Sequence, residues 1–154
     1  MSAIPAQLVR HLNLDVASVR EAGTFVLENG STLDVYTGAR FDNAERCLIT
    51  LAGGGAAGAC SPNLFAQGPL YIGEAVADDR IRVVGIARPD VARIVLVDAA
   101  NATHPVNLTE GRAFLWETTG EAIASAGAPR IMKVYDAAGR QIADMPVPQT
   151  ANGG

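Results

Sequence analysis

Short segments of alternating apolar and polar residues recur along this chain from Gly23 to Val147, each separated from the next by a turn. A period of two is typical of half-buried β-strands, and a spacing of about 8–12 residues is typical of β-sandwiches and β-barrels. None of these segments is followed by a helical pattern of about ten residues or more, which parallel βαβ units require. With roughly nine or ten such segments, we predict an all-β protein with an antiparallel β-sandwich.

The N-terminal residues differ from the rest, because only there do apolar residues follow a helical period. Pro5 suits the first position of a helix and Asp15 can cap a second short turn. We therefore expect residues 1–22 to form a short helical segment packed on the domain. A chain of 154 residues suits one hydrophobic core rather than two. We predict a single β-sandwich domain over residues 23–147 and a disordered tail over residues 148–154.

The only two cysteines, Cys47 and Cys60, flank a glycine-rich segment that follows a predicted strand over residues 46–51. Two thiols on either side of one turn favour a loop-closing disulfide, which we expect to stabilise the fold by about 3 kcal/mol. The alternative is a pair of free buried thiols, since cysteine also packs as a small apolar residue. There is no Cys-x-x-Cys sequence, so a thioredoxin-like redox site is not predicted.

The dipeptide Asn29–Gly30 lies between two alternating segments, residues 24–27 and 33–36. It predicts an antiparallel hairpin with a two-residue type I′ turn, because asparagine and glycine tolerate both positive φ angles of that turn. A second hairpin is predicted near the C-terminus, where residues 136–139 form a turn between two further strands.

The segment between the cysteines carries glycines in the pattern of a dinucleotide-binding loop. Gly53, Gly55 and Gly58 satisfy Gly-x-Gly-x-x-Gly after a predicted strand, and Asp78 follows about 20 residues later. Such a loop must open a helix that is long enough to cross a sheet. Here Pro62 leaves room for only about one or two helical turns. We therefore predict a hairpin loop and retain nucleotide binding as the less favoured alternative.

Composition and charge exclude several classes of function. The net charge is −4 and the only lysine is Lys133, so no basic cluster can follow a nucleic-acid backbone. No apolar run approaches the ~20 residues that span a bilayer. His11 and His104 lack partners at metal-binding spacing, so neither a metal nor a cofactor is predicted. Trp116 shares one face of a predicted strand with Phe114, which favours core packing over an exposed binding aromatic.

Four stretches of the sequence resemble a known class of domains. They are RCL at residues 46–48, LFAQGPL at 64–70, VGIARPDVARI at 84–94 and VYDAAGR at 134–140. Over about residues 14–147 the chain resembles uncharacterised extracytoplasmic domains of actinobacteria, and its second half is similar to an immunoglobulin-like module. The resemblance implies an exported, disulfide-bearing β domain that is Ig-like in its C-terminal half. It carries over no catalytic residue.

We therefore expect a non-catalytic extracytoplasmic interaction or structural module. Its expected partner is a protein or a cell surface, with no nucleic acid and no direct membrane insertion. An export signal or anchor is not expected within this chain, because its first fourteen residues lack a basic stretch followed by an apolar one.

Recognition by sandwiches typically uses end loops or an edge strand. The candidate binding residues of this chain are Gly53, Gly54, Gly55, Gly58, Asp78 and Asp79. The alternative is a small hydrolase whose carboxylates converge only in the folded chain, which predicts a deep pocket with carboxylates of raised pKa.

Overall fold

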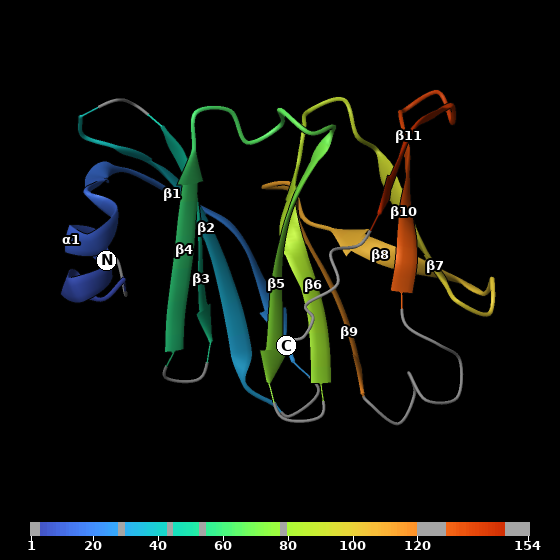
Figure 1. Cartoon of the computed structure of the whole chain (residues 1–154), viewed down its shortest axis with the longest axis horizontal. Helices are drawn as coiled ribbons and strands as arrows, with labels where there is room; N and C mark the ends of the chain where they lie inside the picture. The colour runs from blue at the N-terminus through green and yellow to red at the C-terminus, as the bar shows by residue number, and fades with distance from the viewer. Residues whose placement is uncertain are drawn as a thin grey trace. The chain divides into compact units, whose positions relative to one another are not determined.

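The computed structural model of the chain (Figure 1) describes residues 4–27, 30–42, 45–52, 55–77, 80–119 and 129–146. Within these residues the protein is mostly β, with two antiparallel sheets and one short helix, which confirms the predicted fold class. The chain divides into two compact units, Met1–Ala66 (unit 1) and Gln67–Gly154 (unit 2). The prediction of a single domain did not anticipate this division.

Unit 1 contains α1 (Ala6–Leu12), β1 (Leu14–Val26), β2 (Thr32–Arg40), β3 (Arg46–Ala52) and β4 (Gly55–Ser61). Unit 2 contains β5 (Leu70–Ala77), β6 (Arg80–Ala87), β7 (Arg93–Asp98), β8 (Thr103–Leu108), β9 (Ala113–Thr119), β10 (Pro129–Tyr135) and β11 (Gln141–Pro146).

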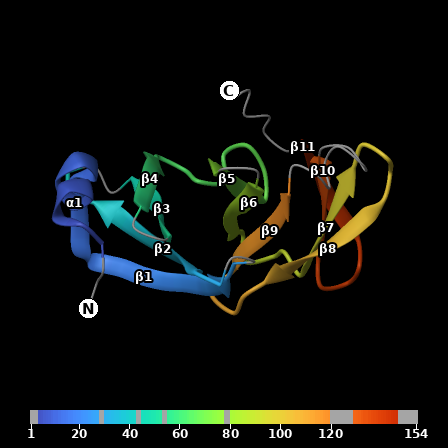
Figure 2. The same cartoon turned by 90° about the horizontal axis from the view of Figure 1, so that it is seen from below.

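The four strands of unit 1 form one sheet in the order β1-β2-β3-β4. The helix α1 packs against the two outer strands, β1 and β4 (Figure 2). A buried cluster fills the space beneath the helix and comprises Ile4, Leu12, Leu14, Cys47 and Ile49.

The segment that follows α1 corrects the prediction of a helical residue range 1–22. Only Ala6–Leu12 is helical, and β1 begins at Leu14. Asn13 ends the helix in the left-handed conformation, with φ of 53°. Ser18 then accounts for part of the strand pairing, because its Oγ accepts a hydrogen bond from the backbone N–H of Ala39 at 2.8 Å. Asp15 still accepts the backbone N–H of Ala17 at 3.1 Å, so its local turn persists as an irregularity within β1 rather than starting a helix.

Within the glycine-rich segment between the cysteines, residues from Gly55 onward form a strand, β4, where a loop was expected. Cys47 and Cys60 lie directly opposite each other in the β3–β4 pair. They form the predicted disulfide, with an S–S distance of 2.01 Å. Glycine and alanine are poor strand formers in isolation, so this strand depends on its cross-strand partners. A Cβ atom at Gly58 would approach Leu12 Cδ1 to 2.8 Å, so a larger residue here requires the Leu12 side chain to shift.

Four hairpins close in the same way. In each, the N–H of the first residue donates to the carbonyl of the fifth, and the N–H of the fourth donates to the carbonyl of the first. They are residues 27–31, 98–102, 109–113 and 136–140. The fourth residue always has positive φ: Gly30 89°, Asn101 66°, Arg112 76° and Gly139 83°. This is the pattern of a three-residue hairpin loop with a bulge.

The first of these turns corrects a prediction. The expected β1–β2 hairpin is present, but it closes between Leu27 and Ser31 rather than through a two-residue turn at Asn29–Gly30. One glycine with positive φ at Gly30 is sufficient for this longer loop.

Unit 2 contains one seven-stranded sheet in the order β11-β10-β7-β8-β9-β6-β5. Residues 103–106 of β8 pair with β7, and residues 107–108 pair with β9. Strand β8 therefore passes from one half of the sheet to the other, as corner strands do. The strand order 10-7-8-9 is that of a Greek key. The sheet curls around a single core (Figure 2). All seven strands contribute to this core through Leu70, Val83, Ile94, Leu96, Val106, Phe114, Met132, Val134 and Met145.

The Greek-key arrangement is compatible with an immunoglobulin-like module but not specific to one. An Ig-like character therefore stays a prediction. The expected tail, residues 148–154, lies outside the described residues.

Candidate functional site

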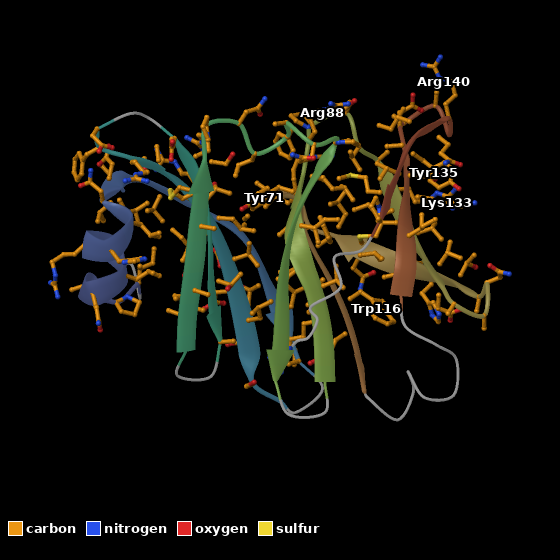
Figure 3. The ribbon with its side chains drawn as sticks, viewed as in Figure 1. Tyr71, Arg88, Trp116, Lys133, Tyr135 and Arg140 are labelled. Carbon is orange, nitrogen blue, oxygen red and sulfur yellow. A yellow bond between two sulfur atoms is a disulfide. The ribbon has the colours of Figure 1, made fainter. Side chains whose placement is uncertain are left out.

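Three loops meet at one end of unit 2. They connect β6 to β7 (residues 88–92), β8 to β9 (residues 109–112) and β10 to β11 (residues 136–140). Together they line an open depression of about 850 Å³, which we call the basin. Figure 3 shows Arg88 and Arg140, from the first and third loops, at this same end. The antiparallel sheet brings the three loops together because each one follows a strand that points in the same direction.

Arg112 joins the first two loops. Its Nη2 donates one hydrogen bond to the backbone carbonyl of Arg88 at 3.0 Å and another to the carbonyl of Val91. The third loop is joined to the first by the backbone N–H of Ala92, which donates to the carbonyl of Tyr135 at 2.8 Å. These bonds hold the shape of the basin before any partner arrives, which reduces the entropy lost on binding.

The lining of the basin includes Asp90 and Asp136, which form ion pairs with arginine, and the buried Val91. Arg88 makes a bidentate pair with Asp90, at 2.7 and 2.8 Å. Hydrogen bonding from Arg88 holds the pKa of the Asp90 carboxyl below its ordinary value. The backbone N–H of Arg140 is the main cause of a lowered pKa at Asp136. Both carboxylates therefore stay charged at neutral pH and are weak proton acceptors.

We expect Arg112→Ala to lower the free energy of unfolding by about 2 kcal/mol, because two carbonyl groups lose a charged donor. Arg112→Gly should recover about 1 kcal/mol of that loss, since glycine adopts the φ of 76° without a steric penalty. Urea unfolding of both variants measures the difference. Equal stability of the two variants would show that positive φ at this position carries no cost.

A second polar cluster lies at the β7–β8 turn. Asp98 is buried, and its Oδ2 lies 2.9 Å from His104 Nε2. Its Oδ1 accepts the backbone N–H groups of Ala100 and Ala102, both at 2.9 Å. The His104 ring also contacts Trp116, with 5.8 Å between ring centroids. The carboxylate therefore holds the turn and the imidazole in place, and the His104 side chain is 37% exposed.

The cluster predicts a loss of stability in acid. The hydrogen bond from His104, together with the two backbone N–H groups, lowers the pKa of Asp98 from 3.8. A lowered folded-state pKa adds stability that is present above pH 3.8 and is lost as the pH falls through the folded-state pKa. Asp98→Asn should therefore be less stable than the wild type at pH 7, and the gap should narrow below pH 3.8. Thermal unfolding across pH 2–7 measures this, and a gap that widens in acid would contradict it.

Of the residues predicted from sequence as a binding site, the two that the structure describes do not line the basin. Gly55 and Gly58 lie in β4 of unit 1. The other four predicted residues, Gly53, Gly54, Asp78 and Asp79, lie outside the described residues. Because β4 runs antiparallel to β3 where a dinucleotide-binding helix would have to begin, the Gly-x-Gly-x-x-Gly interpretation is wrong.

The hydrolase alternative stays a prediction for the described part of the chain. Several of its carboxylates pair with arginine: Asp42 and Glu45 with Arg40, Asp90 with Arg88, Glu117 with Arg82, and Asp136 with Arg140. The described part of the chain contains no group of three or more His, Cys, Asp or Glu side chains placed to hold a metal ion.

Sequence reasoning identified one of the basin loops, residues 136–139, as a turn but did not identify the basin. Residues 98–102 read DAANA and residues 136–140 read DAAGR, but this repeat marks two similar turns of which only the second lines the basin. Arg112 carried no signal, because its partners are backbone carbonyls of a loop about 20 residues away.

Comparisons with known proteins add no relative: no family model, curated protein or solved structure matches this chain. Among the described residues, no helix has the length and apolar character needed to cross a membrane.

Proposed function

We propose that this protein is a non-catalytic, extracytoplasmic interaction module that binds a protein partner through the basin of unit 2. The observation that carries the proposal is the basin itself, in which backbone bonds and Arg112 hold three loops around one open depression. Pre-arranged loops on a rigid β scaffold are a common basis of protein recognition.

The charges on the rim suit a protein surface better than a reaction. Arg140 is 81% exposed and Glu110 is also exposed, so the rim offers both signs of charge to a partner. Asp90 and Asp136 have lowered pKa values, whereas a general acid at neutral pH needs a raised one. The disulfide supports the extracytoplasmic part of the proposal, because such bonds persist mainly in oxidising compartments.

Photo-crosslinking in the native cells tests the basin. A photoreactive phenylalanine analogue replaces Glu110 on the rim, and the matched control replaces Asp144, an exposed residue of β11 outside the basin lining. We expect one defined crosslinked protein from position 110 and none from position 144. Crosslinks that are equal at both positions, or absent from position 110, would contradict the proposal that the basin binds the partner.

Acid quenching of the same cells, followed by alkylation of free thiols, tests the compartment. Protection of both Cys47 and Cys60 from alkylation is the expected result. Full alkylation would place the protein in a reducing compartment and overturn the extracytoplasmic proposal.

A further inference from the structure

The two edges of the unit 1 sheet differ in how they are protected. An exposed strand edge can pair with another chain, and proteins usually protect it with charges, prolines or bulges. Strand β1, at one edge, has two register shifts and carries charged residues such as Arg20 and Glu21. Strand β4, at the other edge, has the sequence GAAGACS and an unbroken register with β3. Gly55, Ala56 and Ala57 of β4 are exposed.

The β3–β4 register shows which backbone groups of β4 point outward. The Cα atoms of Cys47 and Cys60 are 4.0 Å apart. This matches the closer pairs of an antiparallel ladder, in which the two residues share no backbone hydrogen bonds. The N–H and C=O groups of Cys60 therefore point away from β3. Because the pattern repeats every second residue, those of Gly58 and Ala56 do so as well.

A groove runs beside this edge on the side of the sheet that faces α1. It has a volume of about 400 Å³, and its lining comprises Pro5, Gln7, Leu8 and His11 from the helical segment and Ala56 from β4. Gly58 shares the Ala56 side of the strand, since a Cβ atom there would point at Leu12. Of the three residues with outward backbone groups, Ala56 lines the groove, and Gly58 and Cys60 lie on the same face of the strand.

We propose that an extended peptide segment of a partner protein adds to β4 as a fifth strand and inserts a side chain into this groove. Outward N–H and C=O groups at every second residue are complementary only to another extended backbone, which identifies the occupant. Pairing of backbones supplies affinity in this mode of recognition, and a pocket for alternate side chains supplies specificity. The site belongs to unit 1 and is independent of the basin in unit 2.

A phage-displayed library of random peptides, selected on the full oxidised chain, tests the proposal. Peptides enriched in the selection are synthesised, and their dissociation constants are measured by fluorescence anisotropy. Ala56→Pro removes one outward N–H without touching a bond to β3. It should weaken binding by about tenfold or more.

A matched pair of leucine variants tests the groove and remains informative even if the proline variant does not fold. Ala56→Leu fills the groove and should also weaken binding by about tenfold. Ala57→Leu places the same side chain on the opposite face of β4 and should leave affinity within about threefold.

Three results would overturn the proposal. One is a selection in which no peptide is enriched on the wild type relative to the Ala56→Pro variant. Another is a set of peptides that bind the wild type and both Ala56 variants equally. The third is a dimer of the wild type in sedimentation velocity that Ala56→Pro abolishes, since β4 would then pair with a second copy of this chain.

Discussion

Gly85→Ala is expected to lower the free energy of unfolding by about 3 kcal/mol, a loss at the upper end for overpacking a core. Gly85 lies in β6 between Ile72 of β5 and Phe114 of β9. An added Cβ atom would overlap the backbone carbonyl oxygen of Tyr71 and would come within 2.8 Å of Phe114 Cζ. The phenyl ring could rotate slightly, but the carbonyl can move only if β5 separates from β6.

Urea unfolding of this variant should be compared with that of Gly55→Ala. Both changes place the same methyl group in a strand, but at Gly55 the nearest atom is the carbonyl oxygen of Ala52 at an ordinary 3.5 Å. We expect Gly55→Ala to change stability by less than about 1 kcal/mol. A similar loss for both variants would mean that strand flexibility, rather than the close approach of Tyr71, makes Gly85 necessary.

Removal of the disulfide by the double change Cys47→Ala and Cys60→Ala should cost about 3 kcal/mol, because the bond closes a loop with a sequence separation of 13. The loss should be large for this strand in particular, since the Gly- and Ala-rich β4 has few side chains with which to maintain its pairing. Chemical denaturation under oxidising conditions measures the difference.

The control for this prediction is the wild type under reducing conditions. Its stability should fall to within about 1 kcal/mol of the double variant, because the small buried thiols then contribute only packing. A reduced wild type as stable as the oxidised form would show that the cross-strand pairing alone maintains the β3–β4 hairpin.

The hairpins show how much the local sequence can predict. Alternation located most of the strands, including those on either side of residues 136–140, because side chains on a strand alternate between two faces whatever the surrounding fold. The type of turn was harder to predict. Asn29–Gly30 suited a two-residue turn, yet the hairpin closes at Leu27 and Ser31, because the register of β1 and β2 determines where the last pair forms.

Strand β4 illustrates a failure with a physical cause. Gly55 and Gly58 were interpreted as parts of a loop, because glycine loses more conformational entropy in a strand than other residues do. In the folded chain the disulfide and the packing of Leu12 against Gly58 outweigh that cost. Neither the position of Leu12 nor the register of the cysteines is readable from the residues nearby.

The sequence by itself determined the β class and two of the hairpins, and it favoured a Cys47–Cys60 disulfide over two free thiols, because period, turn residues and a single pair of thiols are local properties. Only the tertiary structure decided that residues 88–92, 109–112 and 136–140 form one basin. It alone also placed α1 beside the edge strand β4. Both sites depend on strand order and register, which arise from packing between segments far apart in the chain, and no local pattern encodes that packing.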